Sequence, residues 1–265
     1  MNSTQETAIA TRAKLLALLL IVAAIPLAQA QAAEWGTLTG KFVVQGKVLP
    51  PAVQFPAGVC GGGPILDETL LVGPKGELKN VAIWIAPHRD ETAPEPHPDY
   101  LKLIETPIEL GNLACVYVPH CEVIWTKRPV HLSNKDPITH NYRIDGFKKS
   151  FNLLIQSGDV HIQKFEKQEP VPIPVSCSIH PWMRSWLIIR DSPYAAVTAA
   201  DGTFTIKNLP AGNWTFALWH ESTGYLSGLK LNDETTDRRG QCQIKIEPDK
   251  VTDLGEIIVQ AKDLK

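Results

Sequence analysis

CSIHPWM, at Cys177–Met183, places a thiol, an imidazole and a thioether at every third position of the chain. A second imidazole lies upstream, at the end of the run NKDPITHN that spans Asn134–Asn141. Two imidazoles and a thiolate form the trigonal plane of a mononuclear copper site that exchanges electrons, and a thioether is its weak axial ligand. Zinc favours a further histidine, cysteine or carboxylate over a thioether. We therefore predict one copper ion with four ligands: His140, Cys177, His180 and Met183.

These motifs resemble those of the cupredoxin family, in particular amicyanin and plastocyanin. The short spacing from Cys177 to Met183 is similar to that of the amicyanin ligand loop. The resemblance implies that Asn141, directly after the first histidine ligand, bonds toward the segment of Cys177 and Ser178. Such outer bonds orient the ligands and tune the reduction potential of the metal.

The resemblance also gives the rest of the ligand loop a role. Pro181 and Trp182 are expected to stiffen the loop and to form an apolar collar around the edge of His180, the expected port for electrons. The chain would then be a type 1 (blue) copper protein that carries single electrons between protein redox partners, and no enzyme. Two alternatives stay open: a copper storage or delivery protein, and a structural β-sandwich protein whose cupredoxin domain has no redox role.

The sequence around these motifs predicts an all-β fold. Apolar and polar residues alternate over Trp35–Val44, and a second apolar run covers Leu78–Ala86. Prolines (21) and glycines (18) separate further short runs of this kind, and no helical period longer than two turns is present. This pattern favours antiparallel, sandwich-like sheets, and the resemblance implies a Greek-key sandwich for the copper domain.

A second module is indicated by the residues after the copper loop. The run TAADGTFTIKNLPAGNWTF, at Thr198–Phe216, resembles the carboxypeptidase regulatory-like domain, a transthyretin-like β-sandwich with an interaction or structural role. The strands that precede this motif in that family are missing just upstream, but suitable runs occur near the start of the chain. We therefore expect a discontinuous domain, residues 34–98 and 193–265, with a copper domain inserted at residues 99–192.

The first 30 residues have the features of a secretory signal peptide. Arg12 and Lys14 precede the apolar run Leu15–Leu27, and a small-x-small cleavage site follows at Ala28–Ala30. The apolar run is shorter than the ~20 residues that a spanning helix needs. We expect cleavage near Gln31, a periplasmic or secreted mature chain and no membrane span. The formal net charge of −2 provides no basic surface for nucleic acid.

Five cysteines leave one without a disulfide partner. If Cys177 is the metal ligand, the other four allow three pairings. We favour Cys60 with Cys115, because a tether would benefit the glycine-rich loop around Cys60, and then Cys121 with Cys242. A bridge between Cys115 and Cys121 stays open.

Two further histidines, His120 and His220, are candidates for a second metal site, although a structural, hydrogen-bonded role is expected for each. The sequence contains no spacing typical of a catalytic triad, no glycine-rich phosphate loop and no HExxH motif. Hydrolase and kinase activities are therefore not indicated.

Overall fold

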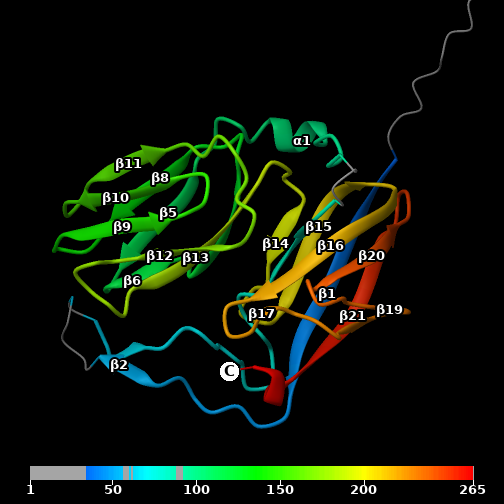
Figure 1. Ribbon diagram of the computed structural model, residues 1–265, viewed down its shortest axis with the longest axis horizontal. Coiled ribbons are helices and arrows are strands. Elements are labelled where there is room, and N and C mark those ends of the chain that lie inside the picture. The colour runs from blue at the N-terminus through cyan, green and yellow to red at the C-terminus, as the bar shows by residue number, and fades with distance from the viewer. Residues whose placement is uncertain (1–33, 56–59, 61, 88–91, 265) are drawn as a thin grey trace, which may run out of the picture. The chain divides into compact units, whose positions relative to one another are not determined.

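The computed structural model describes residues 34–55, 60, 62–87 and 92–264. The predicted signal peptide, residues 1–30, and the predicted cleavage near Gln31 lie outside these ranges. Across the described ranges, no helix is long and apolar enough to cross a membrane. Almost all regular structure is strand, which confirms the predicted all-β fold class (Figure 1).

Strands from the two ends of the chain form two sheets together. One sheet has the order β15-β1-β21, at Thr203–Pro210, Trp35–Gln45 and Val251–Gln260. The other has the order β14-β4-β16-β17, at Ala195–Val197, Ala82–Ile85, Gly212–His220 and Gly224–Tyr225. β20 (Gln241–Ile246) is the fifth strand of this second sheet and pairs with β16. In Figure 1, blue β1 therefore lies beside red β21, although the two strands are far apart in sequence.

The alternation of apolar residues explains how these two sheets share one core. In β1, every second side chain is buried, among them those of Leu38 and Phe42. Side chains of successive strand residues point to opposite faces, so one face of β1 turns to the core. There, Leu38 and Phe42 join Ile83 of β4 and Phe216 of β16 in a single buried cluster.

The middle of the chain forms two further sheets. The first has the order β10-β9-β12-β13-β7, at Ser150–Ile155, His140–Asp145, Ile173–Ser176, Arg184–Arg190 and Cys121–Trp125. The second has the order β11-β8-β5-β6, at Val160–Gln163, Val130–Asn134, Ile108–Leu113 and Val116–Val118. Leu110, Tyr142 and Leu187, from both sheets, belong to one buried cluster.

Short elements complete the fold. They are β2 (Val53–Phe55), β3 (Ile65–Leu66), α1 (Pro98–Leu101), β18 (Lys230–Leu231), β19 (Glu234–Thr235) and the 3-10 helix η2 (Ala261–Asp263). The hairpin of β2 and β3 matters for the site, because Ile65 is buried in the core of the middle sheets and Phe55 packs against it.

The second predicted strand is shorter than the apolar run indicates. The run covers Leu78–Ala86, whereas β4 covers Ala82–Ile85. Asn80 has a φ of 65°, in the left-handed region that interrupts an extended strand. Leu78, before this interruption, lies outside β4 and forms an isolated bridge with Val72.

Strand pairing bears on the expected domain division. β1 pairs with β15 and β21, and β4 pairs with β14 and β16, so strands before the middle sheets pair with strands after them. A smaller cluster joins the middle to this outer part, with Cys121 and Ile188 packed against Trp84 and Trp219. This pairing is what an inserted middle domain requires. The division itself stays a prediction.

Candidate metal centre

The topology of the middle sheets brings the predicted ligands together. His140 is the first residue of β9, Cys177 directly follows β12, and Met183 directly precedes β13. β12 runs antiparallel to both β9 and β13. The start of β9 therefore lies beside the end of β12, where the loop that contains His180 begins. Two hydrogen bonds close this loop: Cys177 N–H donates to the Met183 carbonyl, and Met183 N–H donates to the His180 carbonyl.

Three donor atoms converge in this loop region. Nδ1 of His140 lies 3.0 Å from Nδ1 of His180, which lies 3.7 Å from Sγ of Cys177. All three atoms lie within 4.8 Å of one another. Met183 is buried in the same cluster as Cys177. His140 and Cys177 are buried as well, whereas His180 is half-buried and forms the outer side of the group.

These separations fit a single metal ion. Bonds of about 2.0 Å to nitrogen and about 2.3 Å to sulfur, as zinc makes, place neighbouring donors about 3 to 4 Å apart. The distances from His180 Nδ1 to the other two donors, 3.0 and 3.7 Å, lie in this range. A thiolate with two imidazoles and a nearby thioether is a donor set that suits copper. The residues therefore fit the predicted ion.

Asn141 holds the two ligand segments together. Its Oδ1 accepts a hydrogen bond from the backbone N–H of Ser178 at 2.8 Å and one from the Cys177 thiol at 3.2 Å. Its Nδ2 donates to Oγ of Ser178 and to Oδ1 of Asn152. This is the link between β9 and the ligand loop that the resemblance implies, and it positions the sulfur of Cys177.

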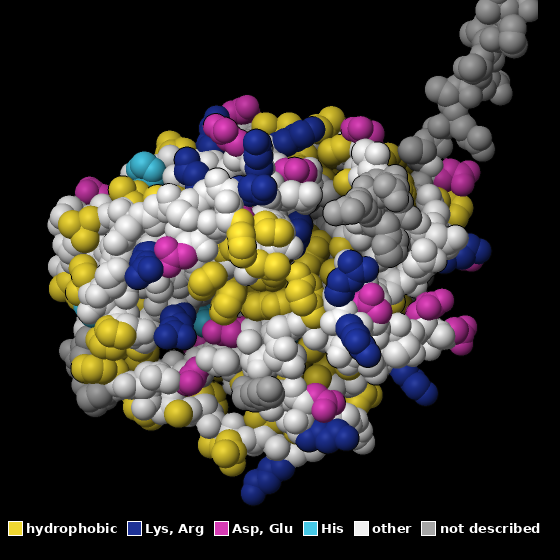
Figure 2. Space-filling view, in the orientation of Figure 1, with side chains coloured by type: hydrophobic (Ala, Val, Ile, Leu, Met, Phe, Trp, Pro, Cys, Tyr) yellow, Lys and Arg dark blue, Asp and Glu magenta, His cyan; other side chains and the backbone are white. Residues whose placement is uncertain are grey.

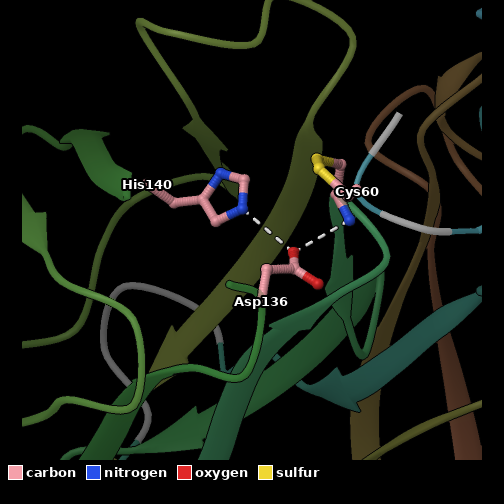
Figure 3. A group of neighbouring side chains, drawn as sticks. Cys60, Asp136 and His140 are labelled. Atoms are coloured by element: carbon pink, nitrogen blue, oxygen red, sulfur yellow. Dashed lines mark hydrogen bonds and ion pairs between the residues drawn. A yellow bond between two sulfur atoms is a disulfide. The ribbon is translucent and has the colours of Figure 1, made fainter. Parts of the chain in front are cut away.

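Asp136 is a functional residue that sequence reasoning missed. Its Oδ2 lies 2.9 Å from Nε2 of His140, and both residues are almost completely buried. The carboxylate also accepts the backbone N–H groups of Ala114 and Cys115, at 2.6 and 2.9 Å. Figure 3 shows Asp136 between the His140 ring and the disulfide of Cys60. The signal was present in the run NKDPITHN, where the aspartate precedes the histidine by four residues.

The electrostatics of the site favour imidazoles that can bind a metal. Burial lowers the pKa of His140, and His180 lowers it further, whereas Asp136 opposes this shift. Burial also lowers the pKa of His180. Both rings are therefore neutral near pH 7. Because a carboxylate only accepts hydrogen bonds, Asp136 keeps the proton of His140 on Nε2 and leaves the lone pair of Nδ1 facing the other donors.

Trp182 contacts three parts of the site. Its Nε1 donates to the Cys115 carbonyl at 3.1 Å, and its ring centroid lies 4.4 Å from that of Phe55 and 5.2 Å from that of His180. These contacts hold the ligand loop from one side. Pro181 is exposed next to it.

The cysteines follow the predicted pairing only in part. Cys60 and Cys115 form a disulfide, the pairing that we favoured. The predicted second bridge between Cys121 and Cys242 is wrong, because both are free thiols. The reason is packing: Cys121 lies in the cluster with Trp84 and Trp219, whereas Cys242 lies in the core of the outer sheets. Each fills apolar space as a small hydrophobic residue. The alternative bridge from Cys115 to Cys121 is likewise absent.

The two remaining candidate histidines have different surroundings. His220 is buried, with Nδ1 2.9 Å from Oγ of Ser222 and Nε2 3.0 Å from the Lys79 carbonyl. Both its nitrogens therefore have structural partners. His120 is also buried, but it lies between two carboxylates, Glu221 and Glu68.

Comparison with known proteins yields matches of structure alone. No family model matches the chain, and no curated protein matches it. A reduced mutant of amicyanin is 14% identical, with a TM-score of 0.29, over 32% of this chain and 82% of that chain. A purple cupredoxin from Nitrosopumilus maritimus is 22% identical, with a TM-score of 0.27, over 31% of this chain and 98% of that chain. A copper-containing nitrite reductase from Thermus scotoductus is 18% identical, with a TM-score of 0.29, over 40% of this chain and 25% of that chain.

Proposed function

We propose that this chain is an extracytoplasmic type 1 copper protein that carries single electrons between protein partners. The observation that supports this proposal is the convergence of Nδ1 of His140, Nδ1 of His180 and Sγ of Cys177 within 4.8 Å. Copper bound there would supply a one-electron couple, with Met183 as its weak axial ligand. With four protein ligands, the copper ion would have no open coordination position for a substrate, which favours a carrier over an enzyme.

The surroundings of the ligands support fast electron transfer. Asp136 fixes the His140 ring, and Asn141 fixes the segment of Cys177 because its Oδ1 accepts the backbone N–H of Ser178. Both supporting residues are buried, as are the two ligands that they hold. A site held in this way changes little when its charge changes, because its ligands are positioned before the electron arrives.

The exposed side of the site offers a place for a redox partner. His180 is half-buried, and its neighbour Ile179 is 50% exposed. Leu113 and Ile138, from segments that contact the site through Asp136 and His140, are 55% and 38% exposed. Apolar side chains at the edge of a ligand suit brief docking of a partner protein, and we assign the electron port to His180.

We further propose that residues 34–98 and 193–265 form a carboxypeptidase regulatory-like sandwich around the copper domain, with a structural or interaction role. The pairing of β1 and β4 with later strands supports it. So does the turn at Asp201 and Gly202, since Gly202 has a φ of 76° and a Cβ there would lie 2.5 Å from the Phe42 carbonyl. Only glycine fits this turn without strain.

Location and partners follow from the same proposal. The disulfide of Cys60 and Cys115 suits an oxidising compartment, in agreement with the predicted signal peptide. On the face in Figure 2, Lys and Arg side chains are interspersed with Asp and Glu side chains, a distribution that does not suit a nucleic-acid backbone. Protein redox partners are the proposed partners.

The test is the visible absorption and EPR spectrum of the mature protein with one equivalent of Cu(II). We expect an intense thiolate-to-copper band at about 600 nm and reversible one-electron cycling. A colourless protein that binds no copper would refute the proposal and leave a structural role. A coloured protein that cannot be cycled would support copper storage or delivery.

A further inference from the structure

His120 lies in a second cluster of metal-ligating groups, which shares no residue with the four predicted ligands. It precedes β7, and its Nε2 lies 2.5 Å from Oε2 of Glu221 in the turn after β16. Its Nδ1 lies 3.4 Å from Oε2 of Glu68, which follows β3. The side chain of His120 is 5% exposed, that of Glu221 10% and that of Glu68 25%. Three separate segments therefore meet at one buried imidazole.

The Nδ1 atom of His120 is the unexplained feature of this cluster. It is buried and makes no hydrogen bond to any described residue. Because the carboxylate of Glu221 can only accept, the Nε2 of His120 donates to it. In a neutral ring, Nδ1 then presents a lone pair to the carboxylate of Glu68. Two acceptors that face one another at 3.4 Å repel unless a proton or a metal ion lies between them.

The same arrangement occurs at His140, where a carboxylate also holds Nε2 and leaves Nδ1 for a metal. A carboxylate on the outer nitrogen is the usual support of a metal-ligating histidine. The separation of 3.4 Å between the His120 and Glu68 donors is also what two bonds of about 2.0 to 2.2 Å to one ion produce.

The cluster borders a cavity with room for an ion and its water ligands. The cavity has a volume of about 210 Å³. Asp67 and Gln54 also line it and carry further oxygen atoms. Pro181 and Trp182 of the ligand loop form another part of its wall, so this cavity adjoins the predicted copper centre.

We propose that His120 and Glu68 bind a divalent transition-metal ion in this cavity, with Asp67 and water completing its coordination and Glu221 as the positioning residue for His120. The donors are nitrogen and oxygen without sulfur. Such a set selects Zn²⁺ or Cu²⁺ over Cu⁺. The chain would therefore hold two metal sites of different character.

The competing occupant is a proton. Burial lowers the pKa of His120, but the hydrogen bonds and charges of Glu221 and Glu68 raise it to about 9. An imidazolium would then bridge the two glutamates as an ion pair, and a metal has to displace its proton. The experiment must distinguish these two states.

The test is a titration of the full mature protein with Zn²⁺, in which calorimetry measures the number of sites and their affinities. NMR of the His120 ring measures its protonation in the same protein. We expect two equivalents of Zn²⁺. Cys177→Ser should weaken one site, and Glu68→Gln should weaken the other by more than about tenfold. Glu221→Gln should weaken the same site as Glu68→Gln. The matched control is Glu109→Gln, because Glu109 pairs with a histidine too, His131 at 3.0 Å, but is exposed on the surface.

Two outcomes would overturn the proposal. In the first, Glu68→Gln and Glu221→Gln bind Zn²⁺ as tightly as the unmodified chain. In the second, the His120 ring of the unmodified protein still takes up a proton at saturating Zn²⁺, which would identify an ion pair only. This NMR measurement needs no variant, so it decides the question even if a variant fails to fold. Because the 600 nm band reports the Cys177 site alone, failure here is distinguishable from failure of the proposed electron carrier.

Discussion

His140 and His120 are supported in the same way but face different atoms. Each ring has a carboxylate at Nε2, the buried Asp136 in one case and the largely buried Glu221 in the other. Nδ1 of His140 faces a second imidazole and lies near the sulfur of Cys177, whereas Nδ1 of His120 faces the carboxylate of Glu68. The orienting carboxylate therefore makes a histidine ready to bind a metal, and the atoms on the other side of the ring decide which metal.

The two sites also differ in how they are anchored. The His140 site is tied to the β2–β3 hairpin by the disulfide of Cys60 and Cys115 and by the packing of Phe55 on Trp182. The His120 cluster takes Glu68 from the end of the same hairpin, but the contacts of the His120 ring with Glu68 and Glu221 are ion pairs and include no covalent bond. Changes to the sulfur, to the covalent tether and to the carboxylates should therefore affect the two sites differently.

The largest expected effect comes from Cys177→Ser, which converts the sulfur site into a set of nitrogen and oxygen donors like that of His120. The charge-transfer band at about 600 nm should disappear completely, because it needs the thiolate. Visible absorption after addition of Cu(II) measures this. Thermal unfolding should change little, since Ser has nearly the same volume.

The control for this variant is Cys242→Ser, another buried cysteine without a disulfide partner. It should keep the band at full intensity. A band that survives in Cys177→Ser would mean that a different residue supplies the thiolate.

Removal of the tether should have the next largest effect. The double variant Cys60→Ser with Cys115→Ser opens a bridge between residues 55 positions apart. A closed loop of this length contributes about 4 kcal/mol to the free energy of unfolding in the chain-entropy model. Urea unfolding measures the loss. Zn²⁺ binding at His120 should weaken as well, because Glu68 lies on the hairpin that the disulfide tethers. Unchanged Zn²⁺ affinity in the folded double variant would show that the hairpin is held in place without the disulfide.

His220 and His120 both lie next to Glu221, His220 in the sequence and His120 in space, but their pKa values shift in opposite directions. Burial lowers the pKa of His220 to about 4, although the Lys79 carbonyl and Glu221 raise it. The unfolded chain, with a pKa of 6.5, binds this proton first as the pH falls. The contribution of His220 to the free energy of unfolding should be fully present above pH 6.5 and decrease by about 3 kcal/mol between pH 6.5 and 4.

His220→Gln should remove this part of the pH dependence, because an amide does not titrate. The free energy of unfolding by urea, measured at several values between pH 7.5 and 4, gives the slope for each protein. Equal slopes in the variant and the unmodified chain would contradict the assignment of a neutral, structural His220.

The comparison of the two histidines also shows what sequence alone can predict. The four ligands are visible in the sequence because His140, Cys177, His180 and Met183 occur at characteristic spacings. Asp136 could have been found, since it lies four residues before His140. Glu221 could not, because it meets His120 across 101 residues, and only the packing of the outer sheets against the middle sheets brings them together.

The cysteines show the same limit. Counting leaves Cys121 and Cys242 as a pair, but a buried thiol and half of a disulfide have the same letter in the sequence. Their separation into two hydrophobic clusters is decided by the register of β7 and β20. The strand predicted from Leu78 begins only at Ala82 for a local reason. The left-handed backbone of Asn80 interrupts it, and an apolar pattern does not reveal such a conformation.

The smallest effect concerns the orienting carboxylates themselves. Asp136→Asn keeps the size of the side chain but weakens its hold on Nε2 of His140, and loss of such an outer contact costs about 10- to 100-fold in metal affinity. Competition with a copper chelator measures this. The band at 600 nm should shift and not vanish, because Cys177 remains. Asp136 also accepts the N–H groups of Ala114 and Cys115, both with φ above 50°.

The hydrogen bonds that Asp136 accepts from Ala114 and Cys115 distinguish it from Glu221. Asp136→Asn should lower the stability of the metal-free protein as well, because the turn at Ala114 and Cys115 loses a charged acceptor, at a cost of about 1 to 3 kcal/mol. Glu221→Gln loses only its charge beside His120, so its effect should be mainly on Zn²⁺ affinity. Thermal unfolding of both variants without metal makes the comparison. If the two lose equal stability, the turn does not depend on the Asp136 charge, and the carboxylate serves the histidine alone.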